Sequence, residues 1–335
     1  MLAKDIGIDL GTANVLIYVK GEGIVLNEPS VVALDQTTNK VLAVGKEAYA
    51  MIGRTPRNIV TIRPLQDGVI ADFNATEWML RHFLHQLNVK GLLTKPKIFI
   101  SCPSNITSVE QKAIRETAEK SGGKTIYLEE EPKVAAIGAG MDIFEPSGNM
   151  VVDIGGGTTD AAVLSMGAIV TASSVKMAGD KLSGEIATYI KKEYKLLIGE
   201  RTAEDVKVKI GSVAPGGRKK DASMEIYGRD MVNGLPRALT VTSEEIEKVL
   251  KEPVDLIIKT ARGVLEKTPP ELAADIIDRG VILTGGGALL HGIDQLLAEE
   301  LKVPVTVAEN PMESVVMGTG KMIDNLNDAV KIKAV

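Results

Sequence analysis

The chain has 335 residues, a formal net charge of -5, 44% hydrophobic residues and a mean hydropathy of +0.09, which together indicate a globular protein with two domain-sized units. The acidic balance and an aromatic content of only 3% argue against a nucleic-acid-binding protein, which needs a basic face and stacking rings. A single cysteine, Cys102, excludes a disulfide framework and a cysteine-based zinc cluster, and it fits a reducing cytosol.

The first residues, "MLAKDIGIDLG", lead directly into a predicted strand without a charged-then-apolar signal region, and no apolar run in the chain approaches ~18 residues. We therefore expect neither export nor a membrane span. Residues 5–34 contain short β-rich runs separated by turn sequences at 11–14 and 20–23, which predicts a mixed sheet. A helix is predicted at 74–89 from its apolar spacing, and a buried strand at 97–103.

A second helix, at 107–123, begins with Thr107 and Glu110 in capping-box register and ends at a glycine pair. A strand at 125–130 follows, and Pro132 is placed as the first residue of the next helix. This order of elements predicts a sheet with crossover helices.

The pattern then begins again, because residues 150–166 repeat the order of residues 5–19: apolar strand, aspartate, glycine-rich reversal, apolar strand. The aspartates are Asp9 and Asp153, and the reversals occupy 11–14 and 155–159. The repeat predicts an internal duplication whose two halves face each other across a cleft.

The rest of the chain predicts helices at 179–194 and 202–210, a β-rich insert at 222–241, and a long helix from Ser243 that is interrupted at Pro253. A third glycine site, Thr284 to Gly287, is predicted between a strand and a helix. A strand at 303–307 and a helix at 311–326 complete the predicted elements.

Glycine clusters at strand ends permit positive φ and leave backbone N–H groups free to hold an anion, so these three sites together predict a nucleotide. The phosphates of a bound nucleotide are accompanied by Mg²⁺, a hard cation that prefers oxygen ligands. We infer that Asp9 and Asp153 hold this ion mostly through waters. Any one of the glycine sites taken alone could equally be a tight turn with no ligand. The P-loop and Rossmann fingerprints are both missing from the sequence.

The segments "GIDLGTAN", "EEEPKVAAIGAG", "DIGGGTTD", "GERTAEDVK" and "LTGGGALL" resemble the actin, Hsp70 and sugar-kinase superfamily, and specifically the bacterial actin homologues of the MreB family. The similarity covers essentially the whole chain and is greatest to the Mbl branch of Gram-positive rods. It implies an α/β actin-like ATPase fold, with domain I at 1–138 plus 312–335 and domain II at 139–311 around a nucleotide cleft.

The resemblance also implies ATP and ADP as ligands with Mg²⁺, self-assembly into filaments of paired protofilaments, and a cytoplasmic position at the inner face of the cell membrane. There the filaments would guide the machinery of lateral peptidoglycan synthesis and so determine rod shape. By the same resemblance, the nucleotide-binding residues are Thr12, Ala13 and Asn14; Gly156, Gly157 and Thr158; Glu204, Asp205, Val206 and Lys207; and Thr284, Gly285, Gly286 and Gly287.

Glu131 occupies the family's water-activating position, where a carboxylate would orient a water for in-line attack on the γ-phosphate, with Thr158 helping to place it. The alternative role for Glu131 is a helix-terminal carboxylate that complements the helix dipole, and both roles can coexist.

The sequence "NVKGLLTKPK", residues 88–97, places Leu92 and Leu93 in a loop flanked by Lys90, Lys95 and Lys97. We predict that the two leucines insert into an anionic membrane surface, as the resemblance supports. Because the chain starts without the N-terminal amphipathic helix of longer family members, the loop would have to carry this contact. The alternative is that the leucines pack back onto the subunit.

Two other functions share this superfamily fold. A small-molecule kinase would need a substrate-aligned base, for which the sequence offers no clear segment, and an Hsp70-type chaperone would need a C-terminal substrate-binding unit. His82 and His85 are one helical turn apart, but without further histidine or cysteine partners we expect them at the surface rather than in a metal site.

Overall fold

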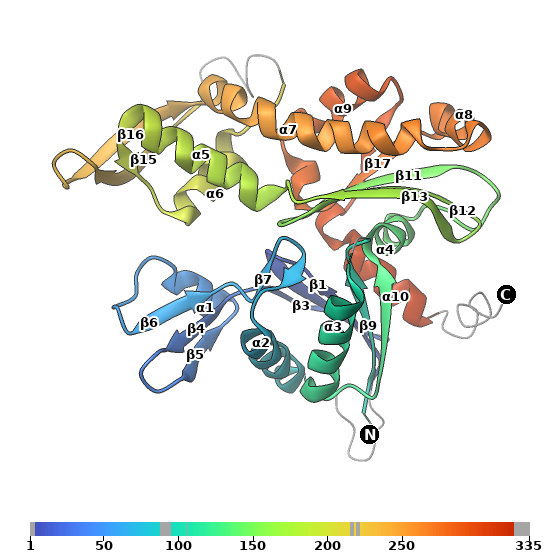
Figure 1. Cartoon of the computed structure of the whole chain (residues 1–335), viewed down its shortest axis with the longest axis horizontal. Coiled ribbons are helices and arrows are strands. Elements are labelled where there is room, and N and C mark those ends of the chain that lie inside the picture. The colour runs from blue at the N-terminus through green and yellow to red at the C-terminus, as the bar shows by residue number, and fades with distance from the viewer. Residues whose placement is uncertain (1–3, 88–94, 105, 215–217, 219–221, 325–335) are drawn as a thin grey trace.

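Two sheets with the same strand connectivity form the two halves of the molecule (Figure 1). This computed structural model describes residues 4–87, 95–104, 106–214, 218 and 222–324. The first sheet has the spatial order β3 (Gly23–Pro29), β2 (Asn14–Val19), β1 (Ile6–Leu10), β9 (Lys97–Cys102) and β10 (Thr125–Glu130). The second has the order β13 (Ala168–Val175), β12 (Thr159–Ser165), β11 (Asn149–Ile154), β17 (Val281–Thr284) and β18 (Val305–Val307). In both sheets the hairpin strands pair antiparallel and the last two join in parallel, which confirms the predicted duplication.

The outer face of the first sheet packs against α2 (Phe73–Gln86) and α3 (Ser108–Ser121). Both helices are capped by side chains. Asp72 Oδ1 accepts from the Ala75 backbone N–H at 2.9 Å, and Thr107 Oγ1 accepts from that of Glu110 at 3.3 Å. The Glu110 carboxylate accepts from the Thr107 N–H at 2.8 Å, so the predicted capping box is present. The helix ends before Gly122, whose φ of 121° disfavours other residues.

A small sheet extends from the first half. It consists of β5 (Lys40–Val44), β4 (Val32–Asp35) and β6 (Ile59–Ile62), and α1 (Lys46–Met51) packs on it. A hairpin of β7 (Leu65–Gln66) and β8 (Val69–Ile70) then leads into α2. The turn of this hairpin reaches the second half, where a β-carbon on Gly68 would lie 2.8 Å from Thr158 Cγ2.

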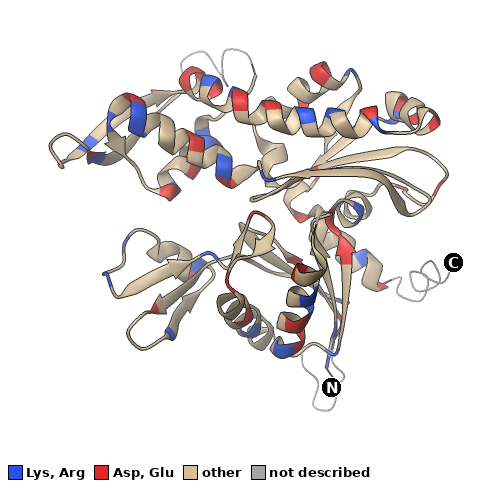
Figure 2. Ribbon diagram, in the orientation of Figure 1, with Lys and Arg blue, Asp and Glu red and all other residues tan. Residues whose placement is uncertain are grey.

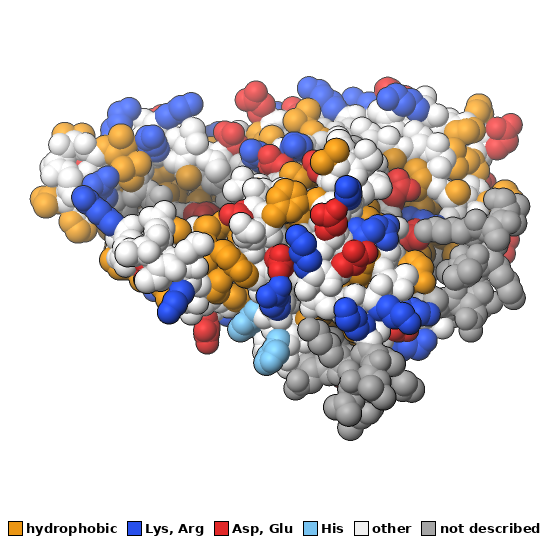
Figure 3. Space-filling model, turned by 60° about the horizontal axis from the view of Figure 1, so that its bottom comes forward, with side chains coloured by type: hydrophobic (Ala, Val, Ile, Leu, Met, Phe, Trp, Pro, Cys, Tyr) orange, Lys and Arg blue, Asp and Glu red, His pale blue; other side chains and the backbone are white. Residues whose placement is uncertain are grey.

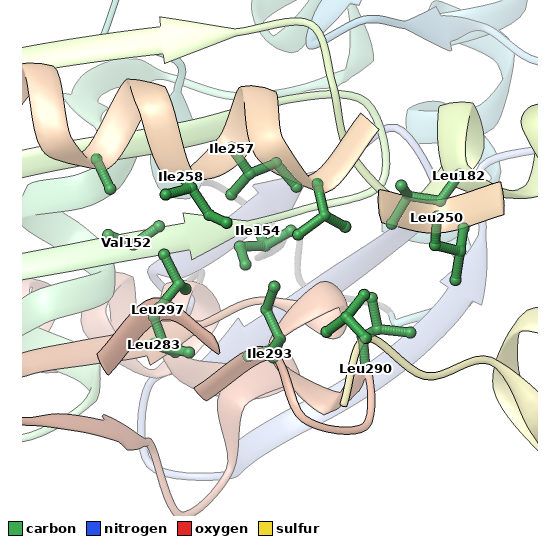
Figure 4. Packing of buried hydrophobic residues seen from close by; sticks show 14 of the residues in the cluster. Val152, Ile154, Leu182, Leu250, Ile257, Ile258, Leu283, Leu290, Ile293 and Leu297 are labelled. Carbon is green, nitrogen blue, oxygen red and sulfur yellow. The ribbon is translucent and has the colours of Figure 1, made fainter. Parts of the chain in front are cut away.

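The outer face of the second sheet is covered by helices far apart in sequence. These are α5 (Gly179–Tyr194), α6 (Glu200–Ile210), α7 (Ser243–Glu266) and α9 (Ile293–Leu301), with α8 (Pro270–Arg279) at one edge. Figure 4 shows Ile257 and Ile258 of α7 facing Val152 and Ile154 of β11. The predicted β-rich insert is the hairpin β15 (Ser223–Asp230) and β16 (Pro236–Thr242), extended by β14 (Leu196–Leu197).

The predicted interruption at Pro253 is wrong, because α7 runs unbroken from Ser243 to Glu266 through the proline. Pro253 is buried, as are Leu250, Val254 and Ile257 on the same apolar face. A proline inside a helix costs roughly 3 kcal/mol. Burying this whole face against the second sheet outweighs that local cost, since most helix stability in proteins comes from tertiary packing. Two other helices begin slightly before their predicted starts at Pro132 and residue 202: α4 begins at Glu131 and α6 at Glu200.

A pair of helices lies between the two sheets: α4 (Glu131–Gly138) and α10 (Ser314–Asp324), which follows η2 (Pro311–Glu313) (Figure 1). Alternate residues of the strands face this pair, such as Phe99 of the first sheet and Val151 of the second. The helices cross very closely. A β-carbon on Gly138 would lie 1.6 Å from the Ser314 carbonyl oxygen, and one on Gly318 would lie 1.9 Å from that of Val134.

Acidic and basic side chains are interspersed along α5, α6 and α7 (Figure 2). Within the described ranges, no helix combines the length and apolar character needed to cross a bilayer. His82 and His85 are exposed on α2. Exposed histidine side chains are pale blue in Figure 3. Nowhere in the described part of the chain do three or more His, Cys, Asp or Glu side chains form a group suited to a metal ion.

Candidate nucleotide-binding site

The two glycine hairpins, which the sequence placed at equivalent strand ends, meet where the halves touch. A β-carbon on Gly156 would lie 2.8 Å from Cβ of Ala13, and one on Gly157 would lie 2.5 Å from Thr12 Oγ1. Any larger residue at either position would therefore push the hairpins apart. Thr12 and Thr158 are both buried at this contact, whereas Asn14, which opens β2, is partly exposed.

A third segment, which no glycine cluster in the sequence indicated, reaches the same point. The turn of the β7–β8 hairpin places Gly68 so that its N–H donates to Thr12 Oγ1 at 3.1 Å. A β-carbon on Gly68 would lie 2.8 Å from Thr158 Cγ2, and its φ of +78° is a conformation that suits glycine. The Asp67-Gly68 pair, a common turn dipeptide, was the available signal.

The predicted metal ligands are buried carboxylates at the ends of equivalent strands. Asp9 is 8% exposed and Asp153 3% exposed. Burial, followed by repulsion from Asp153, raises the pKa of Asp9 to about 7, although a contact from Ser101 lowers it in part. Burial raises the pKa of Asp153 to about 7 as well, against the effect of a hydrogen bond from Thr284 Oγ1 at 2.6 Å. Two buried carboxylates that repel each other are unfavourable in their charged form unless a cation is nearby. The oxygen donors of Asp9 and Asp153 therefore fit Mg²⁺.

These pKa shifts predict how stability depends on pH in the nucleotide-free protein. Because burial raises the pKa of Asp9 and Asp153 from 3.8 to about 7, the folded state binds protons that the unfolded state has released. Their stabilising contribution is complete below pH 4 and is lost as pH rises through 7. We expect the free energy of unfolding to fall over this window in urea titrations, and Asp153→Asn to flatten the slope. An unchanged slope in Asp153→Asn would contradict the assignment.

Glu131 approaches the same carboxylates from the first residue of α4. Its side chain is partly open to solvent, yet protein atoms surround it closely. Burial and the negative charges of Asp153, Asp160 and Asp9 raise its pKa well above the usual range. A carboxylate whose function was only to complement the helix dipole would have its charged form stabilised, so the local field disfavours that alternative as its sole role.

Asp160 also belongs to this group of carboxylates, although no role was predicted for it from the sequence. It is fully buried on β12, directly opposite Asp153 in the strand pairing. Its Oδ1 accepts from the Ser104 backbone N–H at 3.3 Å and from Ser104 Oγ at 3.1 Å, which joins the second half to the loop after β9 of the first. Its Oδ2 is buried and makes no hydrogen bond of regular geometry. The available signal was an acidic residue inside the apolar run "TDAAVL".

The segment predicted to flank adenine and ribose lies on α6. Lys207 Nζ donates to the Gly179 carbonyl at 2.8 Å and to Glu204 Oε2 at 2.7 Å, and Ser183 Oγ donates to the same oxygen at 2.6 Å. Asp205 is exposed. The Val206 side chain is fully buried in the core of the second half, and the contact predicted between Val206 and a nucleotide stays a prediction.

The third glycine site packs on the end of β11. A β-carbon on Gly285, whose φ is +79°, would lie 2.3 Å from the Ile154 carbonyl oxygen, and one on Gly287 would lie 2.2 Å from Ile154 Cγ2. Gly286 faces Met312. The loop is therefore next to the second hairpin, with the Thr284 hydroxyl committed to Asp153.

Leu92 and Leu93 lie outside the described residues, and so does Lys90. The membrane contact predicted for them stays a prediction. The structure brings the two hairpins, the carboxylates, the α6 segment and the third glycine site to one region between the halves.

Comparisons with known proteins find similar sequences and structures over nearly the whole chain. A family model described as MreB/Mbl protein matches residues 3–331. The cell shape-determining protein Mbl of Bacillus subtilis (strain 168) is 71% identical over 333 residues, which cover 99% of each chain. The crystal structure of MreB5 of Spiroplasma citri bound to AMPPNP matches with a TM-score of 0.93 at 41% identity over 99% of each chain. The structure of the same protein bound to ADP matches with a TM-score of 0.92 at 41% identity over 98% of each chain.

Proposed function

The chain belongs to the MreB/Mbl family and has its actin-like fold, and from this premise we propose that it is a cytoskeletal protein that determines cell shape and that binds and hydrolyses ATP. The observation that carries the proposal is the meeting of two equivalent glycine hairpins beside Asp9, Asp153 and Glu131. Family membership favours this function over the small-molecule kinase. The names of its relatives, cell shape-determining protein Mbl and nucleotide-bound MreB5, support it further.

We propose that the backbone N–H groups of the two hairpins, at Thr12 to Asn14 and Gly156 to Thr158, hold the phosphates. The α6 segment at Glu204 and Lys207 and the loop at Gly285 to Gly287 would hold the nucleoside. Asp9 and Asp153 would hold Mg²⁺ mainly through waters, since two carboxylates leave most positions of an octahedral ion to water and phosphate oxygens. Bound there, Mg²⁺ would neutralise charge on the phosphates as the terminal one leaves.

For hydrolysis, we propose that Glu131 orients a water in line with the γ-phosphate and that the Thr158 hydroxyl helps to position that water. The raised pKa of Glu131 means that its protonation state responds to the other carboxylates around it. Phosphoryl transfer depends mainly on positioning and on stabilising charge, so a small change in the Glu131 side chain should have a large effect on rate.

We also propose that the protein assembles with copies of itself into filaments at the inner face of the cytoplasmic membrane, where it would contact the machinery of cell-wall elongation. Electron microscopy of the protein with ATP and liposomes rich in phosphatidylglycerol tests assembly and membrane binding together. Filaments on the liposomes are the expected result. Product formed only when a sugar is supplied with ATP would overturn the cytoskeletal function in favour of the kinase.

Leu92→Ser together with Leu93→Ser tests the membrane contact. Burying each leucine in lipid is worth about 1.5 to 3 kcal/mol, and filaments multiply that effect through avidity. We expect the double variant to keep its melting temperature and nucleotide affinity while liposome co-sedimentation is lost. Lys95→Ser, in the same stretch, serves as a control and should reduce co-sedimentation only partly. Full co-sedimentation of the leucine variant would mean that another surface binds the membrane.

A further inference from the structure

We propose that Tyr49 and Arg63 of the first half and Glu200 and Arg201 of the second form a latch that controls how fast the nucleotide leaves. The proposal rests on the nucleotide binding proposed above. The latch residues lie outside the set predicted to touch the nucleotide or the metal. They join the small sheet of the first half to the first turn of α6.

Two neighbouring contacts make the latch. The Arg63 guanidinium pairs with the Glu200 carboxylate, 137 residues away in sequence. The Arg201 guanidinium carbon lies 5.2 Å from the centre of the Tyr49 ring, which is the geometry of a cation–π interaction. Because Glu200 and Arg201 are consecutive, a single helical turn of the second half is held by two different elements of the first.

A third contact ties the latch to the hairpins. Lys181 Nζ of α5 lies 3.8 Å from Asp67 Oδ1, again between the halves. Asp67 is next to Gly68, whose N–H donates to Thr12 Oγ1 and on which a β-carbon would lie 2.8 Å from Thr158 Cγ2. Movement of the small sheet away from α5 and α6 would therefore pull on the turn that touches both phosphate hairpins.

The latch also adjoins the predicted nucleoside site on α6. Glu204 is one helical turn after Glu200 and Arg201, and it is fixed by Ser183 and Lys207. Arg63 extends to this group as well. Burial raises the pKa of Asp180, and the charges of Arg63 and then Lys207 oppose that shift. Opening the latch would thus move the α6 segment relative to the first half.

The latch lies far from the helix pair that joins the halves, at the end where opening of the halves would be greatest. Figure 1 shows α1 and β6 below α5 and α6 at the end of the molecule away from α4 and α10, the helix pair that joins the halves. The hairpins are in contact at Gly156 and Ala13, so a phosphate can enter or leave between them only if the halves separate. Rotation about the α4–α10 pair opens that end most, and the latch contacts must break first.

Each latch contact is individually weak because its members keep contact with solvent: the Arg63 side chain is 22% exposed and that of Glu200 50%. The latch therefore slows release by a moderate factor and does not block it. Loss of the ion pair or of the cation–π contact should accelerate release about 3- to 10-fold.

The test measures release of a fluorescent ADP analogue from the full chain in Mg²⁺ buffer, chased with excess ATP, for Arg63→Ala, Glu200→Ala and Tyr49→Leu. Each should release faster than the wild type by the stated factor, with an unchanged melting temperature. The double variant with Arg63→Ala and Glu200→Ala should release at the rate of Arg63→Ala alone, because one ion pair can be broken only once. Arg57→Ala, an exposed arginine of the same segment, is the matched control and should release at the wild-type rate.

The outcomes separate the latch from the function on which it rests. Wild-type release rates in all three variants, with normal binding of the analogue by the wild type, would refute the latch and leave nucleotide binding standing. Additive effects in the Arg63 and Glu200 double variant would refute the ion pair as its basis. Failure of the wild-type protein to bind the analogue would refute the proposed nucleotide site, and the latch with it.

Discussion

Replacing Glu131 with alanine should separate nucleotide binding from hydrolysis. The substitution removes the carboxylate proposed to orient the attacking water and leaves both hairpins, Asp9 and Asp153 in place. We expect ATP affinity to change little and the single-turnover rate of phosphate release to fall about 10²-fold, equivalent to about 2.7 kcal/mol in the barrier. Because the charged form of Glu131 is disfavoured where it lies, its loss should not lower the free energy of unfolding at neutral pH.

Phosphate release, ATP affinity and melting temperature measured side by side distinguish the two roles of Glu131. As a helix-terminal carboxylate alone, it would contribute about 0.3 to 1 kcal/mol of stability and nothing to turnover. Glu130→Ala is the matched control, since Glu130 is the adjacent acidic residue and is exposed. A less stable Glu131→Ala protein with a wild-type rate of phosphate release would end the catalytic assignment.

The second large effect is expected at the crossing of α4 and α10. In Gly318→Ala the added methyl group would lie 1.9 Å from the Val134 carbonyl oxygen and 2.8 Å from the carbonyl carbon, both of them backbone atoms that cannot turn aside. The two helices must move apart, and with them the apolar layer between the sheets. We expect a loss of about 3 kcal/mol or more in the free energy of unfolding.

Gly263→Ala provides the control for this prediction. Gly263 lies within α7, and a β-carbon there meets no atom within 4 Å. The same chemical change should therefore stabilise the protein by about 0.4 to 1 kcal/mol, since alanine favours a helix and restricts the unfolded chain. Urea denaturation of both variants gives the comparison. Equal free energies of unfolding for Gly318→Ala and Gly263→Ala would contradict the prediction, because they would mean that the crossing of α4 and α10 accommodates the added methyl group.

Much of the fold could be predicted from sequence because its signals are local. The capping box of Thr107 and Glu110, the strands before each glycine hairpin and the repeat of residues 5–19 at 150–166 all depend on neighbours within a few positions. Turn chemistry and hydrophobic period therefore sufficed for them. Pro253 shows where local reasoning failed: the packing of its helix face, which no local signal contains, outweighed the cost of a proline.

The candidate site divides in the same way. The sequence was sufficient to predict the site residues at the two hairpins, at Asp9 and Asp153, and at Glu131. It was also sufficient to identify the family that these residues resemble. The burial that raises the pKa of these carboxylates was not, because it arises only when the two sheets close around the α4–α10 pair.

The sequence by itself determined the repeated strand-and-turn pattern, the glycines that allow close approach and the acidic residues that follow each strand. It could do so because dihedral preferences and hydrogen bonds between near neighbours are properties of short segments. Only the tertiary structure decided that Asp160 accepts from Ser104, that Arg63 pairs with Glu200 and that Gly318 touches Val134. These partners are 56, 137 and 184 positions apart, and contacts over such separations depend on how whole sheets and helices pack.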